Sequence, residues 1–566
     1  MASIIKKKIK GHLYYYYAES KRVDGKPKLV NQKYLGTAEK LLGLALLAEK
    51  PINEHVLYSN EAEFGAVMIV YDIAKRLGIV ELIDSIVPKR KQGVSVGMYI
   101  LTAAINRATC PSSKNGLEDW FSSTCLPSVT GFSPSSFTPQ NFWNNTGISA
   151  DDIDRAEESI LRRMLAYHDI DTTHIIYDAT NFFTYIDTMN GSELPKRGRC
   201  KAKRNDLRIV GLSMMVSPDF SIPLLSSTYP GNRPDAKEFA RIMERLKARY
   251  ESITDKAADV TVVFDRGNNS EDNLDFLESG DFKLHFVGGL KKNQAKKLFE
   301  VDRSDYKPMA GSSLEGQSAF RSKMEVFGRS MTVVIVHNPE LENGQLQGIL
   351  INREKTLAKL AEVQQNLERR STGEIKRGKR PTVESVANSV EKILASEYMK
   401  DIIDYEISEK DGHIGLTFEF SHDKLEGLRS GVLGKTALFT DRDDFTTEQI
   451  IVAYRSAWKI EAAFKQLKDP DHLTVRPIFH WTDEKIRVHI FSCVLAYRLC
   501  CLLIKELFDR GIRITINRLI DEMSQVKRIH TFFGDLKKPQ KVESFTRGSE
   551  TAMEIETIYK LKEQYS

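Results

Sequence analysis

The sequence has few cysteines, and their positions do not suit a metal site or a disulfide framework. The six cysteines are Cys110, Cys125, Cys200, Cys493, Cys500 and Cys501. None of them form the Cys-x-x-Cys spacing of structural zinc sites, and the chain is far longer than the small secreted folds that depend on disulfides. We therefore expect a reduced protein of the cytoplasm.

Long hydrophobic runs and a strong net charge are also lacking. No apolar stretch approaches the length of a membrane span, and the basic start MASIIKKKIKGH lacks the apolar core of a secretory signal. We expect no membrane partner. With 82 Lys and Arg against 77 Asp and Glu, the net charge is only +5. The total charge therefore says little about nucleic acid, and only its distribution along the chain is informative.

The length of 566 residues exceeds what a single hydrophobic core supports. Changes of pattern along the chain predict six segments. They are a β-hairpin segment (1–50), a helical domain that is a candidate for DNA binding (51–170), the first part of an α/β core (171–290), an insertion domain (291–440), the second part of the core (441–510) and a C-terminal helical tail (511–566).

Basic side chains occur in the predicted helical domain. They are Lys89, Arg90, Lys91, Arg107 and Lys114. Such a group is typical of a surface that lies against DNA, but a solvated basic surface explains it equally well. Both interpretations stay open.

Strand patterns begin at Thr173 and define the core. A short apolar run ends at Asp178, strands at 209–216 and 222–229 follow, and the three should form an antiparallel meander. After a helix at 235–250, the apolar strand at 259–267 has the composition of a buried parallel strand and ends in Asp265. A further strand is expected at 282–289, so Asp178 and Asp265 should lie on neighbouring strands.

The connection at 195–208, PKRGRCKAKRNDLR, holds seven basic residues and one acid. Lys201, Lys203 and Arg204 lie in its centre, and the loop should be near Asp178. A polyanion-binding loop and a solubilising loop are both compatible with this composition.

The stretch Ile450 to Leu473 predicts a helix that continues almost without interruption toward Leu503. Its predicted buried face holds Ile450, Ala453, Trp458, Phe464 and Leu467. Beside that face, Tyr454, Glu461 and Lys468 recur every seven residues and should lie above one another. Alone, this pattern also fits an ordinary amphipathic helix with a solvated Glu and Lys.

Together, Asp178, Asp265 and Glu461 predict a metal site in a ribonuclease H-like core. Hard divalent cations take carboxylate oxygens, so the three acids are suited to two Mg²⁺ or Mn²⁺ ions. Such a pair supports in-line displacement at phosphorus. Each aspartate alone also fits a turn or cap, and the prediction rests on the ordered set.

These residues resemble the DDE transposases of bacterial and archaeal insertion sequences, in the group with a Tyr-x2-Arg-x3-Glu-x6-Lys signature. YDATNF (177–182) resembles the Asp-x-Thr motif, with Asp178 and Thr180, and VVFDRGNNS (262–270) resembles the Asp-Arg-Gly motif, with Asp265. Tyr454, Glu461 and Lys468 match the third motif. The large separation between Asp265 and Glu461 is typical of this group.

The resemblance implies an α/β fold, in which a ribonuclease H-like mixed sheet is interrupted by a β-rich insertion domain and preceded by an all-α domain. It implies an enzyme that binds the terminal inverted repeats of its own element on double-stranded DNA as a homodimer. Water would free a 3′-OH, which then attacks target DNA. Asp178, Asp265 and Glu461 would hold the two ions, Tyr454 and Lys468 would contact the DNA end, and Arg266 would contact phosphate.

One position departs from the signature, because Ala457 stands where the group has arginine. A guanidinium grips phosphate with two parallel bonds, which Lys468 cannot copy. Arg455 and Arg476 are nearby, although neither occupies the signature position. The alternative is a DNA-binding protein with an inactive core, acting as a repressor of transposition or a domesticated factor.

Overall fold

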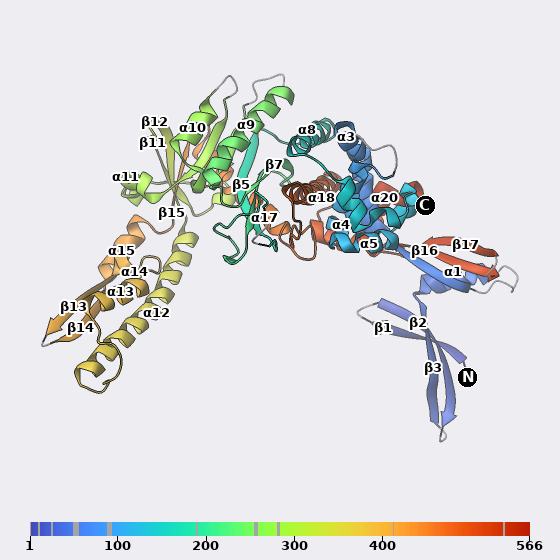
Figure 1. The fold of residues 1–566 in the computed structure, drawn as a ribbon, viewed down its shortest axis with the longest axis horizontal. Coiled ribbons are helices and arrows are strands. Elements are labelled where there is room, and N and C mark those ends of the chain that lie inside the picture. The colour runs from blue at the N-terminus through green and yellow to red at the C-terminus, as the bar shows by residue number, and fades with distance from the viewer. Residues whose placement is uncertain are drawn as a thin grey trace.

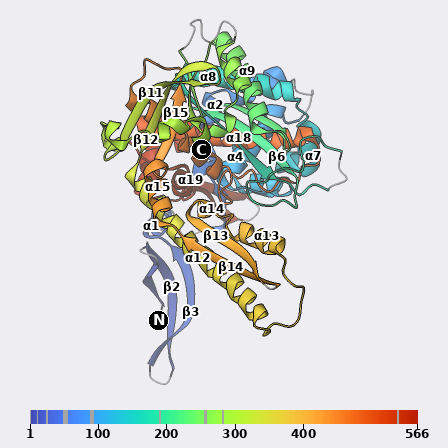
Figure 2. The ribbon, with the colours of Figure 1, turned by 90° about the vertical axis from the view of Figure 1, so that its left-hand side faces the viewer.

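The computed structural model describes most of the chain. The described residues are 2–9, 12–23, 26–48, 56–87, 93–187, 191–253, 259–279, 283–410, 412–535 and 538–566. Figure 1 shows an elongated body with two projections that point downward from its opposite ends, and Figure 2 shows both still pointing that way after a quarter turn.

A nine-stranded mixed sheet forms the centre of the core, with strands in the order β10-β11-β12-β15-β9-β8-β5-β6-β7. The strands are β5 (His174–Phe183), β6 (Ile209–Val216), β7 (Pro223–Pro230), β8 (Thr261–Phe264), β9 (His285–Leu290), β10 (Lys307–Pro308), β11 (Ser318–Val326), β12 (Arg329–His337) and β15 (Lys435–Thr440). The predicted antiparallel meander β5-β6-β7 is confirmed, as is the parallel pairing of β8 with β5.

Helices cover both faces of β5. Tyr177 packs edge-on against Phe239 of α9 (Asp235–Ile253), with the ring centroids 5.0 Å apart. Side chains alternate across a strand, so Asp178 and Thr180 point to the opposite face. That face meets α17 (Trp458–Gln466), while α16 (Thr447–Arg455) packs on β8, β9, β12 and β15. α10 (Glu271–Glu278) packs against α9.

The sequence-based end of β5 was wrong. The strand continues past Asp178 to Phe183 and pairs with β6 along its whole length from Ile176. Thr180 and Phe182 are buried, so the residues after the aspartate still belong to the sheet core. Asp178 therefore lies within a strand and not at its end.

The predicted β-rich insertion at 291–440 was also wrong in extent and composition. β10, β11, β12 and β15 belong to the central sheet, because the apolar strand MTVVIVH of β12 is buried between β11 and β15. What leaves the sheet is residues 339–434, here called the arm. The arm contains α12 (Pro339–Ser371), α13 (Val383–Ile393), α14 (Met399–Ile402), β13 (Ile403–Lys410), β14 (His413–Phe420) and α15 (His422–Gly431).

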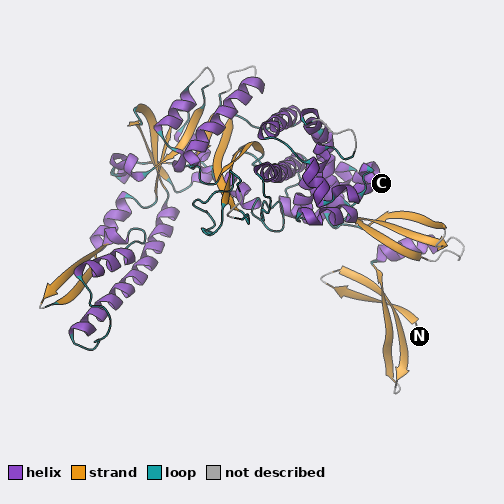
Figure 3. Cartoon of the chain, viewed as in Figure 1, coloured by secondary structure: helices purple, strands orange, loops and turns teal. Residues whose placement is uncertain are grey.

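The arm is mostly helical and has its own hydrophobic core, with Leu360, Val390 and Met399 buried at its centre. Figure 3 shows its helices beside a single hairpin of strands. Short helical turns complete the core: α11 (Lys296–Phe299), η3 (Arg266–Asn268), η4 (Lys292–Gln294), η5 (Arg303–Asp305) and η6 (Ser312–Leu314).

The predicted helices of residues 60–167 are present. They are α2 (Gly65–Arg76), α3 (Ile79–Ile86), α4 (Val96–Thr109), η1 (Lys114–Gly116), α5 (Leu117–Ser123), α6 (Leu126–Thr130), η2 (Pro134–Phe137), α7 (Pro139–Asn145) and α8 (Ala150–Tyr167). Three of them, α2, α4 and α8, pack against α18 (Asp483–Asp509), which also packs against β7. α18 thereby joins the helical region to the core.

α18 is long and apolar enough to cross a membrane, so the expectation that no apolar stretch approaches that length was wrong. Inside the molecule, 89% of its most apolar window is buried. That burial is the ordinary state of a core helix.

The C-terminal segment is not purely helical, in contrast to the prediction. Between α19 (Ile516–Met523) and the pair α20 (Glu550–Tyr559) and α21 (Leu561–Tyr565) lies a hairpin of β16 (Lys527–Asp535) and β17 (Lys538–Phe545). β16 also pairs with β4 (Val56–Glu63), an early strand that the sequence pattern did not reveal. The two ends of the chain therefore build one small sheet.

The predicted hairpin near the start is confirmed as β2 (His12–Val23) and β3 (Lys26–Gly36), and β1 (Ala2–Ile9) adds a third strand. Its turn at Asp24-Gly25 lies outside the described residues. α1 (Ala38–Ala48) follows. This sheet is the second projection of Figure 1.

Candidate active site

Asp178 lies on β5 in a half-buried position on the face that meets α17. Burial raises the pKa of its carboxyl to about 6, the Lys201 ammonium opposes that rise, and Asp265 and Asp235 add to it. A cation near this carboxyl would lower its pKa and so favour the ionised form.

Asp265 follows β8 directly and is exposed. Its Oδ1 accepts the backbone N–H of Arg266 at 2.7 Å and the Tyr454 hydroxyl at 3.2 Å. Because β8 is parallel to β5 and adjacent to it, Asp265 reaches the electrostatic neighbourhood of Asp178. The expectation that the two aspartates come from neighbouring strands is confirmed.

The predicted near-continuous helix is in fact three pieces. α16 ends at Arg455, where Ser456 Oγ donates to the Ala453 carbonyl at 2.6 Å, and α17 begins after Ala457. α18 starts only at Asp483. The break turns Trp458 outward, with 62% of its surface exposed, so its predicted place on the buried face was wrong.

Despite the break, Tyr454 and Lys468 both reach the two-aspartate region. Burial and the neighbouring Asp265 raise the pKa of Tyr454, which keeps its hydroxyl protonated as a donor to that carboxylate. Lys468 Nζ donates to Thr180 Oγ1 at 2.6 Å, two residues from Asp178. Burial and the cations Lys201 and Arg476 lower the pKa of Lys468.

Glu461 lies in the first turn of α17, which packs on β5, and its side chain is exposed. Its charge contributes to the raised pKa of Tyr454, so it faces the same region. Within the described part of the chain, no three His, Cys, Asp or Glu side chains converge closely enough to hold a metal ion. The carboxylates of Asp178 and Asp265 have the donor chemistry of a hard-cation site, and Glu461 is not gathered with them.

The two arginines near Ala457 have different surroundings. Arg455 points away, because its Nη1 and Nη2 donate to the Ser313 carbonyl and to Gln317 Oε1. Arg476 lies beside Lys468 and donates from Nη2 to the carbonyl of that residue at 3.0 Å. A guanidinium is therefore present next to Lys468, although it comes from a later segment than the signature predicts.

The basic loop at 195–208 does lie beside β5, as expected. Lys201 Nζ donates to the Ala179 carbonyl and is 3.9 Å from Asp235 Oδ2. Arg204 instead pairs with Asp206 through two hydrogen bonds of 2.9 and 2.7 Å, and Lys203 is exposed. Arg266 is exposed next to Asp265.

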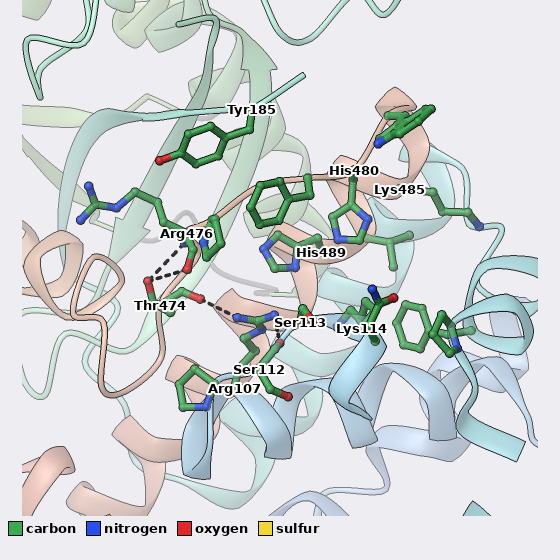
Figure 4. A pocket seen from close by; sticks show the side chains of 18 of the residues that line it. Arg107, Ser112, Ser113, Lys114, Tyr185, Thr474, Arg476, His480, Lys485 and His489 are labelled. Atoms are coloured by element: carbon green, nitrogen blue, oxygen red, sulfur yellow. Dashed lines mark hydrogen bonds between the residues drawn. The ribbon is translucent and has the colours of Figure 1, made fainter. Parts of the chain in front are cut away.

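Neither interpretation of the basic residues in the helical domain, a DNA-contacting surface or a solvated one, fits two of the five. Arg107 is buried, and the ammonium of Lys114 is buried as well. Lys89, Arg90 and Lys91 lie outside the described residues. Arg107 and Lys114 line a cavity of about 930 Å³ that Lys468 and Arg476 also line (Figure 4). Apart from an excess of basic residues in two distant segments, nothing in the sequence indicates this cavity.

Comparisons with known proteins agree with the motifs. The family model described as the transposase DDE domain matches residues 170–499, more than half of the chain. No curated protein matches the sequence.

Among solved structures, the chain is similar to a piggyBac transposase synaptic complex with hairpin DNA. The TM-score is 0.38 and the identity 9%, over 83% of this chain and 82% of that chain. The family match covers β5, β8 and α17, which carry Asp178, Asp265 and Glu461. The chain belongs to the DDE transposase family.

Proposed function

We propose that the chain binds the terminal inverted repeats of its own element and catalyses divalent-metal-dependent cleavage and strand transfer of DNA. The observation that supports the proposal is the parallel pairing of β5 and β8, which brings Asp178 and Asp265 close enough to interact electrostatically. Tyr454 is hydrogen-bonded to Asp265, and Lys468 is hydrogen-bonded to Thr180 beside Asp178.

In this proposal Asp178 and Asp265 would hold two Mg²⁺ or Mn²⁺ ions together with Glu461, which would have to move toward them from its exposed position on α17, because the three carboxylates are not gathered in this structure. Such ions activate an attacking oxygen and stabilise the leaving oxygen at phosphorus. The chain itself prepares the ligands: the Arg266 N–H and the Tyr454 hydroxyl fix the orientation of Asp265, and burial within the sheet limits the movement of Asp178.

The basic residues have a separate role in the proposal, which is to hold DNA. Lys468 lies next to Thr180 on the acid-bearing strand, where an ammonium can contact the phosphate beside the cleaved bond. Arg476 supplies the guanidinium that Ala457 does not. Lys201, Lys203, Arg204 and Arg266 extend the positive potential around Asp178.

The two ends of an element must be held together before strand transfer, and we propose that a homodimer on double-stranded DNA does this. The protein would act on DNA inside the cell.

The test is cleavage of a duplex that carries the element's own terminal inverted repeat, in Mg²⁺ or Mn²⁺. Wild type should nick at the end and expose a 3′-OH, and an added target duplex should then be joined to it. Asp265→Ala should bind the duplex without nicking it. Asp272→Ala, an exposed acid on α10, is the matched control and should cleave as wild type does.

Two results would contradict the proposal. If wild type binds the ends but cuts with neither metal, the inactive DNA-binding alternative replaces it. If wild type cuts but never joins the excised end to the target, the chain is a nuclease.

A further inference from the structure

The cavity of about 930 Å³ lies where the helical region meets the core. Its walls come from α4 and the turn after it, from α7, from the residues that follow β5, and from the segment 468–489. Figure 4 shows Arg107, Lys114, His480 and His489 around the same space. Its volume lies within the usual range of small-molecule sites, roughly 300–1,000 Å³.

The floor of this cavity is positively charged and has no carboxylate among its lining residues. Lys114 Nζ is buried and makes no hydrogen bond with any residue that the structure describes; its contact is the Phe142 ring, 4.6 Å away. Arg107 donates from Nη2 to the Ser112 carbonyl at 2.5 Å and from Nη1 to the Thr474 carbonyl at 3.5 Å, while its Nε is buried without an acceptor among the described residues.

A buried cation without an acidic partner is strongly destabilising, and proteins ordinarily place a carboxylate beside it. The state of the nearby groups agrees with an excess of positive charge. Burial and Arg107 lower the pKa of Lys114 to about 7, and burial with Lys114 and Arg107 lowers the pKa of His480 to about 3. An anion bound here would supply the missing negative charge.

The mouth of the cavity is aromatic. Tyr185, Phe479 and Trp481 are 47%, 53% and 70% exposed. The rings of Tyr185 and Phe479 stack at 5.3 Å with an angle of 27° between their planes. Exposed aromatic surface of this kind, next to cations, is typical of sites where nucleic-acid bases stack.

The cavity also adjoins the proposed active site, because Lys468 lines it and is bonded to Thr180 on β5. A ligand with a phosphate on the cationic floor and a planar base at the mouth would lie beside the strand that carries Asp178.

We propose that this cavity binds the phosphorylated terminal nucleotide of a DNA strand, with the phosphate at Arg107 and Lys114 and the base against Phe479 and Trp481. The identification of the strand as DNA rests on the proposed function. The phosphate site itself rests on the buried, unmatched cations.

The experiment measures binding of the full chain to an eight-residue thymidine oligonucleotide with a 3′ fluorophore, by fluorescence anisotropy without divalent metal. One oligonucleotide carries a 5′-phosphate and the other a 5′-hydroxyl. The phosphorylated strand should bind about ten-fold more tightly, since charge-assisted hydrogen bonds contribute more than neutral ones. Lys114→Met should abolish that preference. Trp481→Ala should weaken both strands about ten-fold, and Trp458→Ala, exposed elsewhere, should change neither.

Inorganic phosphate and thymidine 5′-monophosphate serve as competitors and keep the test independent of the folding of any variant. Both should displace the phosphorylated strand from wild type, but only at much higher concentration than the strand itself. Equal affinity for the two oligonucleotides would overturn the proposal, as would a preference that survives in Lys114→Met. Thymidine monophosphate binding as tightly as the strand would replace the DNA end by a free nucleotide.

This inference and the proposed function fail separately. A 5′-phosphate preference in a chain that never cleaves leaves the cavity assignment standing and removes the catalytic one. Cleavage by a chain with no such preference does the reverse.

Discussion

At the scale of single residues, Asp178 is held where its ionised form is destabilised. The pKa of the Asp178 carboxyl in the folded protein, about 6, lies above its ordinary value of 3.8. Between pH 3.8 and pH 6 the carboxyl is therefore protonated in the folded protein but ionised in the unfolded chain. The stability contributed by this group is present below pH 3.8 and is lost as the pH rises through 6. At neutral pH the site therefore carries a cost that a bound cation would relieve.

Asp178→Asn should consequently be more heat-stable than wild type above pH 6, without divalent metal. We expect a gain of about 1–3 kcal/mol, or roughly 2–4 °C in Tm, that disappears below pH 4. Thermal melting between pH 4 and 8 measures it. Asp206→Asn is the control with the opposite sign, since Arg204 lowers the pKa of Asp206 to about 2, and it should show no gain. A Tm difference for Asp178→Asn that is independent of pH would contradict this account.

Gly289 on β9 allows Tyr454 to approach Asp265. A Cβ at position 289 would lie 2.4 Å from Tyr454 Oη, a distance that no side chain tolerates. Gly289→Ala should therefore displace the phenol and break its bond to Asp265, and we expect a fall of about ten-fold or more in the cleavage rate. Gly344→Ala on α12, where a Cβ meets nothing, is the control.

The same displacement predicts a non-additive pair. Tyr454→Phe removes the hydroxyl that Gly289→Ala would move, so the double variant should cleave no more slowly than the worse of the two single variants. Rates measured on the end duplex decide it. Additive losses would mean that Gly289 acts on something other than Tyr454.

At the scale of elements, the sequence predicted whether a segment is a helix or a strand better than it predicted where that element ends. The meander, the parallel β8 and the helices of 60–167 follow from apolar periodicity and are present. The end of β5 was misplaced because Asp178 looks like a terminator in sequence, whereas tertiary pairing with β6 continues beyond it. The break at Ser456 and Ala457 was missed because neither residue is a Gly or Pro that would signal it.

The sequence placed Asp178 and Asp265 on neighbouring strands, as the structure has them, but it placed Lys468 on a helix that ends at Gln466, and it did not predict the cavity. Asp178, Asp265, Tyr454 and Lys468 belong to short motifs that can be read locally. Arg107, Lys114 and Trp481 meet only because α18 packs the helical region against the core, and no local pattern encodes that contact.

The arm at 339–434 should be separable from the core. The Asn338 N–H donates to the Gly434 carbonyl at 2.9 Å, so the two ends of the arm are adjacent and a short glycine-serine linker can join them. The arm has its own buried core and contributes no strand to the central sheet. Its polar contacts with the core include the pairs of Glu342 with Arg303 and His337, which lie beside the point of attachment. Its removal should leave the Tm of the remainder within a few degrees of wild type.

DNA binding should respond differently to this deletion. The connector between α12 and α13 lies at the far end of the arm. Its four basic side chains are exposed: Lys376, Arg377, Lys379 and Arg380. If these contact phosphates, the deletion should weaken end binding and reduce the slope of log K against log salt by about 0.9 for each lost contact. Replacement of all four basic residues of the connector by alanine, in the otherwise intact chain, should reproduce the reduced slope. An unchanged slope in both would show a solvated linker.

At the scale of the whole molecule, the order of the segments along the chain was predicted, but the pairing of strands from distant segments was not. β4, β16 and β17 form one sheet from residues more than 400 positions apart, and strand pairing over such a distance leaves no trace in local periodicity. The same holds for β15, which returns to the central sheet after the arm. For this reason β15 was predicted to belong to the insertion domain, and β16 and β17 were predicted to belong to a helical tail.

This joining predicts that the C-terminal helices stabilise the start of the helical region. Tyr565 Oη donates to Asp72 on α2 at 2.9 Å, and Tyr559 Oη donates at 2.7 Å to Glu506, which also pairs with Arg76. Removal of residues 549–566 would expose the apolar surface that these helices cover and break both bonds. Each large apolar side chain so exposed costs roughly 1.5–3 kcal/mol, and a few of them equal the net stability of a typical domain.

We therefore expect the chain without 549–566 to lose cooperative melting of its helical region, seen by circular dichroism as an early transition well below the Tm of wild type. Deletion of residues 2–37 is the matched control, since β1, β2 and β3 pack mainly on one another and on α1. That deletion should leave the main transition in place. An early transition in both truncated chains, or in neither, would mean that the C-terminal helices do not hold α2 and α18 together, and that these helices are stable by their mutual packing alone.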